Sequence, residues 1–166
     1  MSETATAKAA SETRRGGKYL TFALGDEEYG LAILKVREII KIMAITAVPR
    51  TPHHVKGVIN LRGQVISVVD LRAKFGMPAV ERTEQTCIIV VDIRHGDRKI
   101  NTGIVVDRVS EVLNVLEEHI EDAPSFDTGV DSDFIMGMGK IGNTVKILLD
   151  IDKVLGADDI VEAIAN

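Results

Sequence analysis

The sequence of 166 residues contains no tryptophan and one cysteine, Cys87. A single cysteine cannot form an intramolecular disulfide, and it cannot supply the thiolate sets of structural zinc sites. No run of about 18 uninterrupted apolar residues occurs, and residues 1–17 lack the apolar stretch of a signal peptide. These absences predict a protein of the reducing cytoplasm without direct membrane insertion.

The chain also lacks the excess of positive charge that a nucleic-acid-binding protein needs. The formal net charge is −5, which opposes binding to a phosphate backbone. The distribution is uneven, because residues 35–74 hold eight Lys or Arg against the two acids Glu38 and Asp70, whereas residues 111–133 hold eight acids and no Lys or Arg. We expect no nucleic-acid partner and two faces of unlike charge, although solvated loops would explain any single charge equally well.

Aromatic residues make up only 4% of a chain that is 45% hydrophobic, so Val, Ile and Leu must fill the core, and branched side chains favour strands. The pattern predicts about nine or ten short strands and only a few short helices. Five local features are expected: a hairpin turning at Gly25-Asp26, a helical turn that leads from Ile33 into a strand, a helix capped by Asp70, one hairpin joining 86–94 to 100–115, and a last helix ended by Gly156.

Short motifs typical of catalysis or ligand binding can be found, but the sequence around them does not support either function. Gly137-x-Gly139-x-x-Gly142 has the letters of a dinucleotide fingerprint, but a strand pattern follows it, so a β-turn with Gly142-Asn143 at its tip is the better interpretation. The neighbours His53 and His54 lack metal-ligand spacing, and no serine or cysteine elbow is present. Cys87 precedes an apolar run and is expected to be a small buried side chain. We predict no catalytic, metal or cofactor site.

One stretch of the sequence is much more specific. Residues 57–76, GVINLRGQVISVVDLRAKFG, resemble the signature of the CheW family of chemotaxis coupling proteins, and further similarity lies in GDEEYGLAILKVREI, GIVVDRVSEVL, APSF and LLDIDKVL. Several motifs in the right order are more specific than any single one. The resemblance identifies residues 18–158 as a CheW-like domain, between a flexible tail at 1–17, which has no apolar periodicity, and a short tail at 159–166.

The resemblance implies a mainly β fold, in which two small five-stranded SH3-like β-barrels pack over a shared hydrophobic seam with a few short helices. It implies a non-catalytic adaptor that couples the cytoplasmic tips of chemoreceptors to the histidine kinase CheA and helps to assemble receptor–kinase arrays. The implied partners are the regulatory domain of CheA, the helical hairpin of a methyl-accepting chemoreceptor and other copies of the coupler in rings. Location would be cytoplasmic, with recruitment to membrane-associated arrays.

The resemblance also implies two contact surfaces. The expected receptor-binding residues are Val36, Glu38, Gly57, Arg62, Val109 and Val112, and the expected kinase- or coupler-binding residues are Phe126 and Glu121. Two positions depart from the family pattern. Ser67 replaces a proline, which restores a backbone donor and should alter a local sheet edge, and Glu121 stands where some relatives have a basic residue.

Two other classes of function remain open at this level. A small enzyme or ligand-binding barrel would hold Arg62 in a deep pocket with convergent polar groups. A nucleic-acid-binding SH3-like barrel would need a continuous basic patch in spite of the net negative charge.

Overall fold

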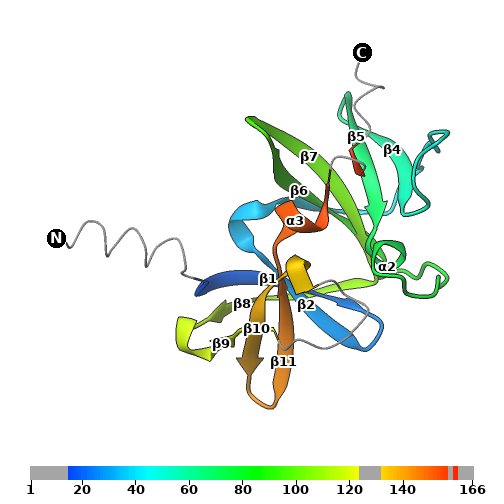
Figure 1. Cartoon of the computed structure of the whole chain (residues 1–166). Coiled ribbons are helices and arrows are strands. Elements are labelled where there is room, and N and C mark those ends of the chain that lie inside the picture. Colours follow the sequence, from blue (N-terminus) through cyan, green and yellow to red (C-terminus); the bar gives the residue numbers. More distant parts are fainter. Residues whose placement is uncertain (1–14, 124–131, 157–158, 161–166) are drawn as a thin grey trace.

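The computed structural model describes residues 15–123, 132–156 and 159–160 of the chain, and it confirms a mainly β fold built on two sheets (Figure 1). Sheet A has the strand order β8-β1-β2-β11-β10-β9, and sheet B has the order β3-β6-β7-β5-β4. The strands of sheet A are β1 (Gly17–Leu24), β2 (Glu27–Ala32), β8 (Arg108–Val115), β9 (Ile120–Glu121), β10 (Ile135–Ile141) and β11 (Thr144–Leu149). Those of sheet B are β3 (Val36–Lys41), β4 (Val55–Leu61), β5 (Gln64–Asp70), β6 (Cys87–His95) and β7 (Arg98–Val106).

Short helices connect the strands. They are η1 (Ile33–Lys35), α2 (Leu71–Lys74), η2 (Glu117–His119), η3 (Ser132–Phe134) and α3 (Ile151–Val154). Sheet B closes on itself, because Thr46, which follows β3, exchanges backbone hydrogen bonds of 2.8 and 2.9 Å with Val58 on β4. Sheet A has six strands rather than the expected five, since the two-residue β9 extends it beside β10. Within the residues described, no helix is long and apolar enough to cross a membrane.

The chain passes between the sheets at two strand junctions. It leaves β2 of sheet A through η1 and enters β3 of sheet B, and it returns from β7 of sheet B to β8 of sheet A across Asp107. The second junction corrects the expectation of one continuous strand over 100–115. The apolar pattern runs through Asp107 without a break, so periodicity alone could not reveal that the two halves belong to different sheets.

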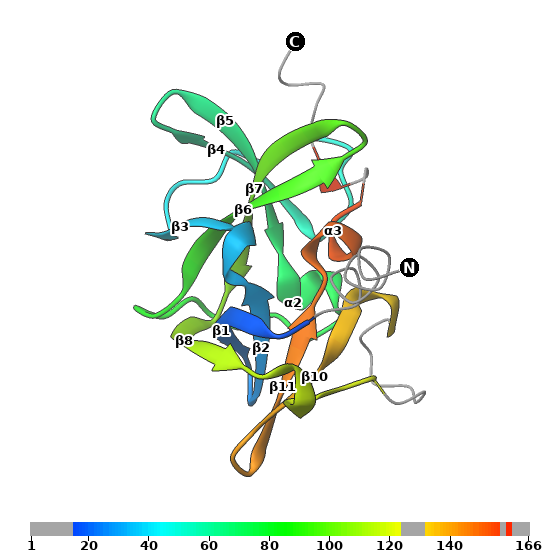
Figure 2. The same ribbon diagram turned by 90° about the vertical axis from the view of Figure 1, so that its left-hand side faces the viewer.

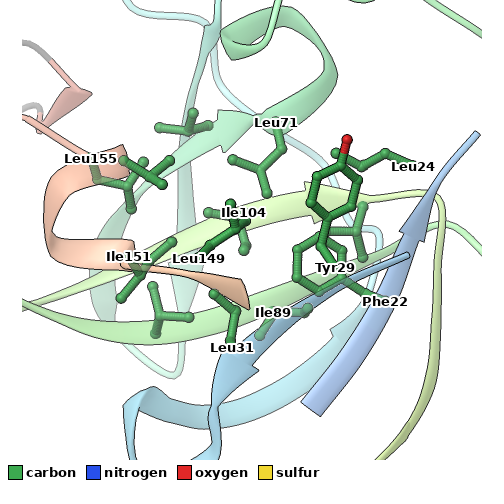
Figure 3. Close-up of a cluster of buried hydrophobic side chains, with 14 of the residues drawn as sticks. Phe22, Leu24, Tyr29, Leu31, Leu71, Ile89, Ile104, Leu149, Ile151 and Leu155 are labelled. Atoms are coloured by element: carbon green, nitrogen blue, oxygen red, sulfur yellow. The ribbon is translucent and has the colours of Figure 1, made fainter. Parts of the chain in front are cut away.

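Three hydrophobic clusters explain why the sheets form one body. The largest takes side chains from both sheets and from α2 and α3, including Phe22, Leu31, Ile89, Ile104 and Ile151 (Figure 3). A second cluster around Ile66 and Ile88 lies within sheet B, and a third around Tyr19 and Leu148 lies within sheet A. The side chains of the first cluster cannot be covered by one sheet alone, so their burial holds the two sheets together.

Strand β1 illustrates the double core. Its side chains at Leu20, Phe22 and Leu24 face the shared cluster, whereas Tyr19 faces the cluster of sheet A. Every residue from Tyr19 to Leu24 is buried. The alternating pattern in the sequence therefore identified the strand, but burial on both faces depends on the second sheet.

Most local expectations are confirmed. Leu24 pairs with Glu27 around the turn at Gly25, η1 leads into β3, and the β6–β7 hairpin pairs from Cys87–Val106 to His95–Arg98. The Asp70 side chain caps α2 by accepting from the Arg72 N–H at 3.0 Å. Gly142 and Asn143 turn β10 into β11. The last helix ends at Val154, but Gly156 does not adopt a left-handed conformation as its terminator; its N–H donates to Asp159 instead.

Ser67 was expected at a sheet edge, and that expectation is wrong. Strand β5 lies between β4 and β7, and Ser67 pairs with Val58 on one side and Thr102 on the other. Ser67 is 7% exposed and Thr102 is fully buried. The register of β5 is fixed by the strands on its two sides. The serine therefore adds a polar group to the interior of sheet B.

Residues at both ends of the expected domain make contacts with its body. Arg15 and Gly16 precede β1, and the Arg15 guanidinium bonds Asp122 at 2.8 Å and the Met136 carbonyl at 3.2 Å. At the other end, Asp159 is fully buried and accepts hydrogen bonds from Lys74 Nζ at 2.9 Å, Gly156 N at 2.8 Å and His54. Residues assigned from sequence to the two tails thus make specific contacts with the body of the protein.

Gly57 has no room for a side chain. Its φ is +140°, and a Cβ atom there would stand 1.9 Å from the Thr46 carbonyl oxygen. We expect Gly57→Ala to lower the free energy of unfolding by about 3 kcal/mol or more, because backbone strain and overlap with backbone atoms add together. Urea titration should show a lower midpoint with an unchanged slope.

The matched control is Gly63→Ala. Gly63 has φ +87° with open space around its Cβ position, so the substitution carries only the dihedral cost of about 1 to 2 kcal/mol. Equal losses in the two variants would contradict the steric role of Thr46.

The buried carboxylate of Asp159 predicts a pH dependence. Burial raises the pKa of Asp159, but hydrogen bonds from Lys74, Gly156 and His54 outweigh burial and hold the pKa below its ordinary value of 3.8. Because the folded pKa is depressed, this stabilisation is complete above pH 3.8 and is lost as pH falls through the folded value. We expect Asp159→Asn to lose about 2 to 4 kcal/mol at pH 7, with the difference from the unsubstituted chain shrinking below about pH 4. A difference that stays constant down to pH 2 in urea titrations would refute the charge contribution.

Candidate functional site

The turn between β4 and β5 presents Arg62 to solvent. Leu61 pairs with Gln64, so Arg62 and Gly63 form a two-residue turn, and both have positive φ, at +53° and +87°. This is the backbone of a type I′ turn, where Asn or Gly normally occupies the first position. Asn60 supports the turn by accepting from the Gly63 N–H at 2.8 Å. Arginine is uncommon in this conformation, so the turn holds Arg62 at a cost in backbone energy.

The Arg62 side chain reaches across to β3. Its guanidinium pairs with the carboxylate of Glu38, and the two side chains are 69% and 33% exposed. This hydrogen bond raises the pKa of Arg62 above its ordinary value. Exposed ion pairs contribute little to folding, so the pair defines a charged surface feature more than it stabilises the protein. Two expected receptor-binding residues are thereby brought into contact.

Val36 and Val109 lie where the shared core reaches the surface. Both are partly buried against the largest cluster, Val36 on edge strand β3 and Val109 on edge strand β8. Cys87 links the two strands, because it pairs with Lys41 on β3 and the Val109 backbone hydrogen-bonds its thiol. The two edges run on the same side of the molecule (Figure 2). Each valine therefore lies on a strand edge and borders the shared cluster.

The other expected receptor-binding residues differ in accessibility. Val112 is 50% exposed on β8, where it pairs with Leu20. Gly57 is buried beneath the backbone of Thr46, so a partner cannot contact it directly, and a change at Gly57 would act through the segment that covers it. Sequence motifs cannot separate these two cases, because valine and glycine are both often buried, and the motif does not show which copy is exposed.

The second expected surface includes strand β9 of sheet A. Glu121 on β9 is exposed and forms an ion pair of 2.8 Å with Lys140 on β10. Strand β9 follows β8 closely along the chain, and Ile120 of β9 packs with Val115 of β8 in the cluster of sheet A. Phe126 lies outside the described residues.

Several observations argue against a catalytic site around Arg62. The Arg62 side chain is exposed, so it is not enclosed in a deep pocket with convergent polar groups. Across the described parts of the chain, no group of three His, Cys, Asp or Glu side chains is arranged to hold a metal ion. Burial raises the pKa of the Cys87 thiol, which disfavours the nucleophilic thiolate. The arrangement suits recognition by charge and shape rather than chemistry.

The sequence-based site omitted Arg72 and Asp107. Arg72 donates from Nε to Asp107 Oδ1 at 2.8 Å and from a terminal nitrogen to Oδ2 at 2.7 Å. Arg72 belongs to the same motif as Arg62, which was a usable signal. Nothing in the sequence indicated Asp107 as its partner, because 35 residues separate them.

Comparison with known proteins agrees with this architecture. The family model described as CheW-like domain matches residues 18–159. A chemotaxis protein CheW of Klebsiella aerogenes is 42% identical over 152 residues, covering 92% of this chain and 89% of that protein. One of Helicobacter pylori is 34% identical and covers 85% and 82%.

A solved structure shares the fold. The scaffolding protein TtCheW of Thermoanaerobacter tengcongensis superposes with a TM-score of 0.75 at 35% identity, over 84% of this chain and 92% of that one. Sequence and structure agree over most of the length of each protein. The chain therefore belongs to the CheW-like domain family of non-catalytic chemotaxis adaptors.

Proposed function

We propose that this chemotaxis adaptor couples the cytoplasmic hairpin tips of methyl-accepting chemoreceptors to the regulatory domain of the histidine kinase CheA, in cytoplasmic arrays recruited to the membrane by the receptors. The observation that carries the proposal is the exposed Arg62, which has a left-handed backbone conformation and pairs with Glu38. The receptor surface is defined as Val36, Glu38, Arg62, Val109 and Val112.

The receptor surface has the composition that a helical hairpin requires. An amphipathic helix places an apolar stripe into a groove and polar residues at its rim. Val36 and Val109 supply partly buried apolar contacts, Val112 extends them on the open edge of β8, and Arg62 with Glu38 forms a polar rim. The guanidinium is planar and can bind a receptor carboxylate through two parallel hydrogen bonds when it releases Glu38.

A second surface is needed for coupling. Glu121 is 64% exposed on edge strand β9 and is not one of the residues that define the receptor surface, so it can contact a second partner. We assign Glu121 and Phe126 to contact with the kinase regulatory domain or another copy of the coupler. Coupling then works by differential binding, since a receptor state that changes the geometry of the adaptor favours one state of the kinase.

The first test of the function is a titration of the full chain against a receptor cytoplasmic fragment and the CheA regulatory domain, separately and together. The proposal expects saturable binding to each and kinase activity that rises only when all components are present. Binding to neither would overturn it.

Charge reversal tests the role of Arg62. We expect Arg62→Asp to weaken receptor binding about tenfold or more, because a partner carboxylate would meet a like charge, and to leave thermal stability nearly unchanged. Calorimetric titration measures the first and thermal unfolding the second. The control is Arg50→Asp, since Arg50 is also exposed with positive φ, at 62°, but lies outside the receptor surface.

A charge swap separates recognition from internal support. The double variant Arg62→Glu with Glu38→Arg restores the ion pair across β3 in reverse. If Arg62 itself contacts the receptor, binding stays weak in the swap. Recovered binding would show that the pair only holds the turn, and a large loss of stability in Arg62→Asp would contradict the surface role.

A further inference from the structure

Asp107 occupies the crossover from sheet B to sheet A, between the end of β7 and the start of β8. Its carboxylate accepts hydrogen bonds from the Gly25 N–H at 2.7 Å and from the Arg72 guanidinium, and its own N–H donates to the Ala23 carbonyl at 3.1 Å. Gly25 and Ala23 belong to the β1–β2 hairpin of sheet A, whereas Arg72 lies on α2 directly after β5 of sheet B. One side chain is therefore held by both sheets.

The Arg72–Asp107 contact is directional. Arg72 donates to both carboxylate oxygens of Asp107 and also to the Pro78 carbonyl at 2.9 Å, and the Arg72 side chain is only 12% exposed. The hydrogen bond from Arg72 lowers the pKa of Asp107, and the same bond raises the pKa of Arg72. Both groups thus stay charged near neutral pH. The shared hydrophobic core resists separation of the sheets but does not by itself fix their angle, whereas a planar two-pronged ion pair does.

The position of this contact relates it to the receptor surface. Val109 follows Asp107 by two residues on β8 of sheet A, while Val36, Glu38 and Arg62 belong to sheet B. The receptor surface therefore spans both sheets, and its shape depends on the angle at the crossover. We propose that Arg72 and Asp107 are positioning residues that fix this angle and so set the placement of β8 against β3 for receptor binding. The receptor-binding part of this inference rests on the proposed function.

The angle can be measured without any partner. Spin labels on Val65→Cys in sheet B and Val145→Cys in sheet A, positions 52% and 49% exposed, report the distance between the sheets in a Cys87→Ser background. We expect Arg72→Gln and Asp107→Asn to broaden or shift the distance distribution, with Arg72→Lys between them and the parent, because lysine keeps the charge but not the fork.

The control for the distance measurement is Arg37→Gln. Arg37 pairs with Asp92 at 3.8 Å, and both residues belong to sheet B, so this substitution removes an arginine ion pair that does not cross between sheets. Distributions in the Arg72 and Asp107 variants that match the parent would overturn the inference.

A binding experiment tests the consequence for function. Titration of Arg72→Gln and Asp107→Asn against a receptor cytoplasmic fragment should show affinity about tenfold lower, while affinity for the CheA regulatory domain changes less than about twofold. Unchanged receptor affinity, or an equal loss for both partners, would overturn the positioning role. Failure of the unsubstituted chain to bind the receptor would overturn the proposed function instead, and the spin-label distances would still decide whether the ion pair fixes the angle.

Discussion

Burial of the hydrophobic cluster shared by the two sheets holds the protein together. Side chains from β1 and β2 in sheet A pack against β6 and β7 in sheet B, and α2 and α3 close the cluster (Figures 1 and 3). Each sheet also has a smaller cluster of its own. Because most of the deeply buried side chains belong to the shared cluster, neither sheet would retain its core if the other were removed.

Hydrogen bonds and ion pairs add directional contacts to this apolar packing. Asp107 is bound from both sheets at the crossover, and Asp159 ties the end of the domain to Lys74 on α2 and to His54. Both carboxylates are surrounded by donors, which is the condition under which a charge can remain in a partly or fully buried place. The hydrophobic cluster thus holds the two sheets together. The ion pairs favour one relative orientation of the sheets among those that hydrophobic packing alone would permit.

The features proposed for recognition lie where this compact body leaves apolar or strained groups at the surface. Val36 on β3 and Val109 on β8 pack against the shared cluster and are only partly buried, and the turn after β4 holds Arg62 in a backbone conformation that favours glycine or asparagine. The motif Asn-Leu-Arg-Gly has a structural explanation for each member. Asn60 and Gly63 form the turn, Leu61 packs against the cluster of sheet B, and Arg62 remains available.

Features that depend on near neighbours could be predicted from the sequence: the hairpins, the Asp70 cap, the turn at Gly142 and the β-rich class. Hydrophobic period, turn residues and caps act over a few positions. The sequence also identified the family and the exposed Arg62. Four features could be seen only in the folded protein: the run through Asp107 divides between two sheets, Ser67 lies in an interior strand, Gly57 is covered by Thr46, and Asp159 is buried. These features arise from contacts between residues distant in the chain, such as Arg72 with Asp107 and His54 with Asp159, and local patterns carry no record of which distant groups will meet.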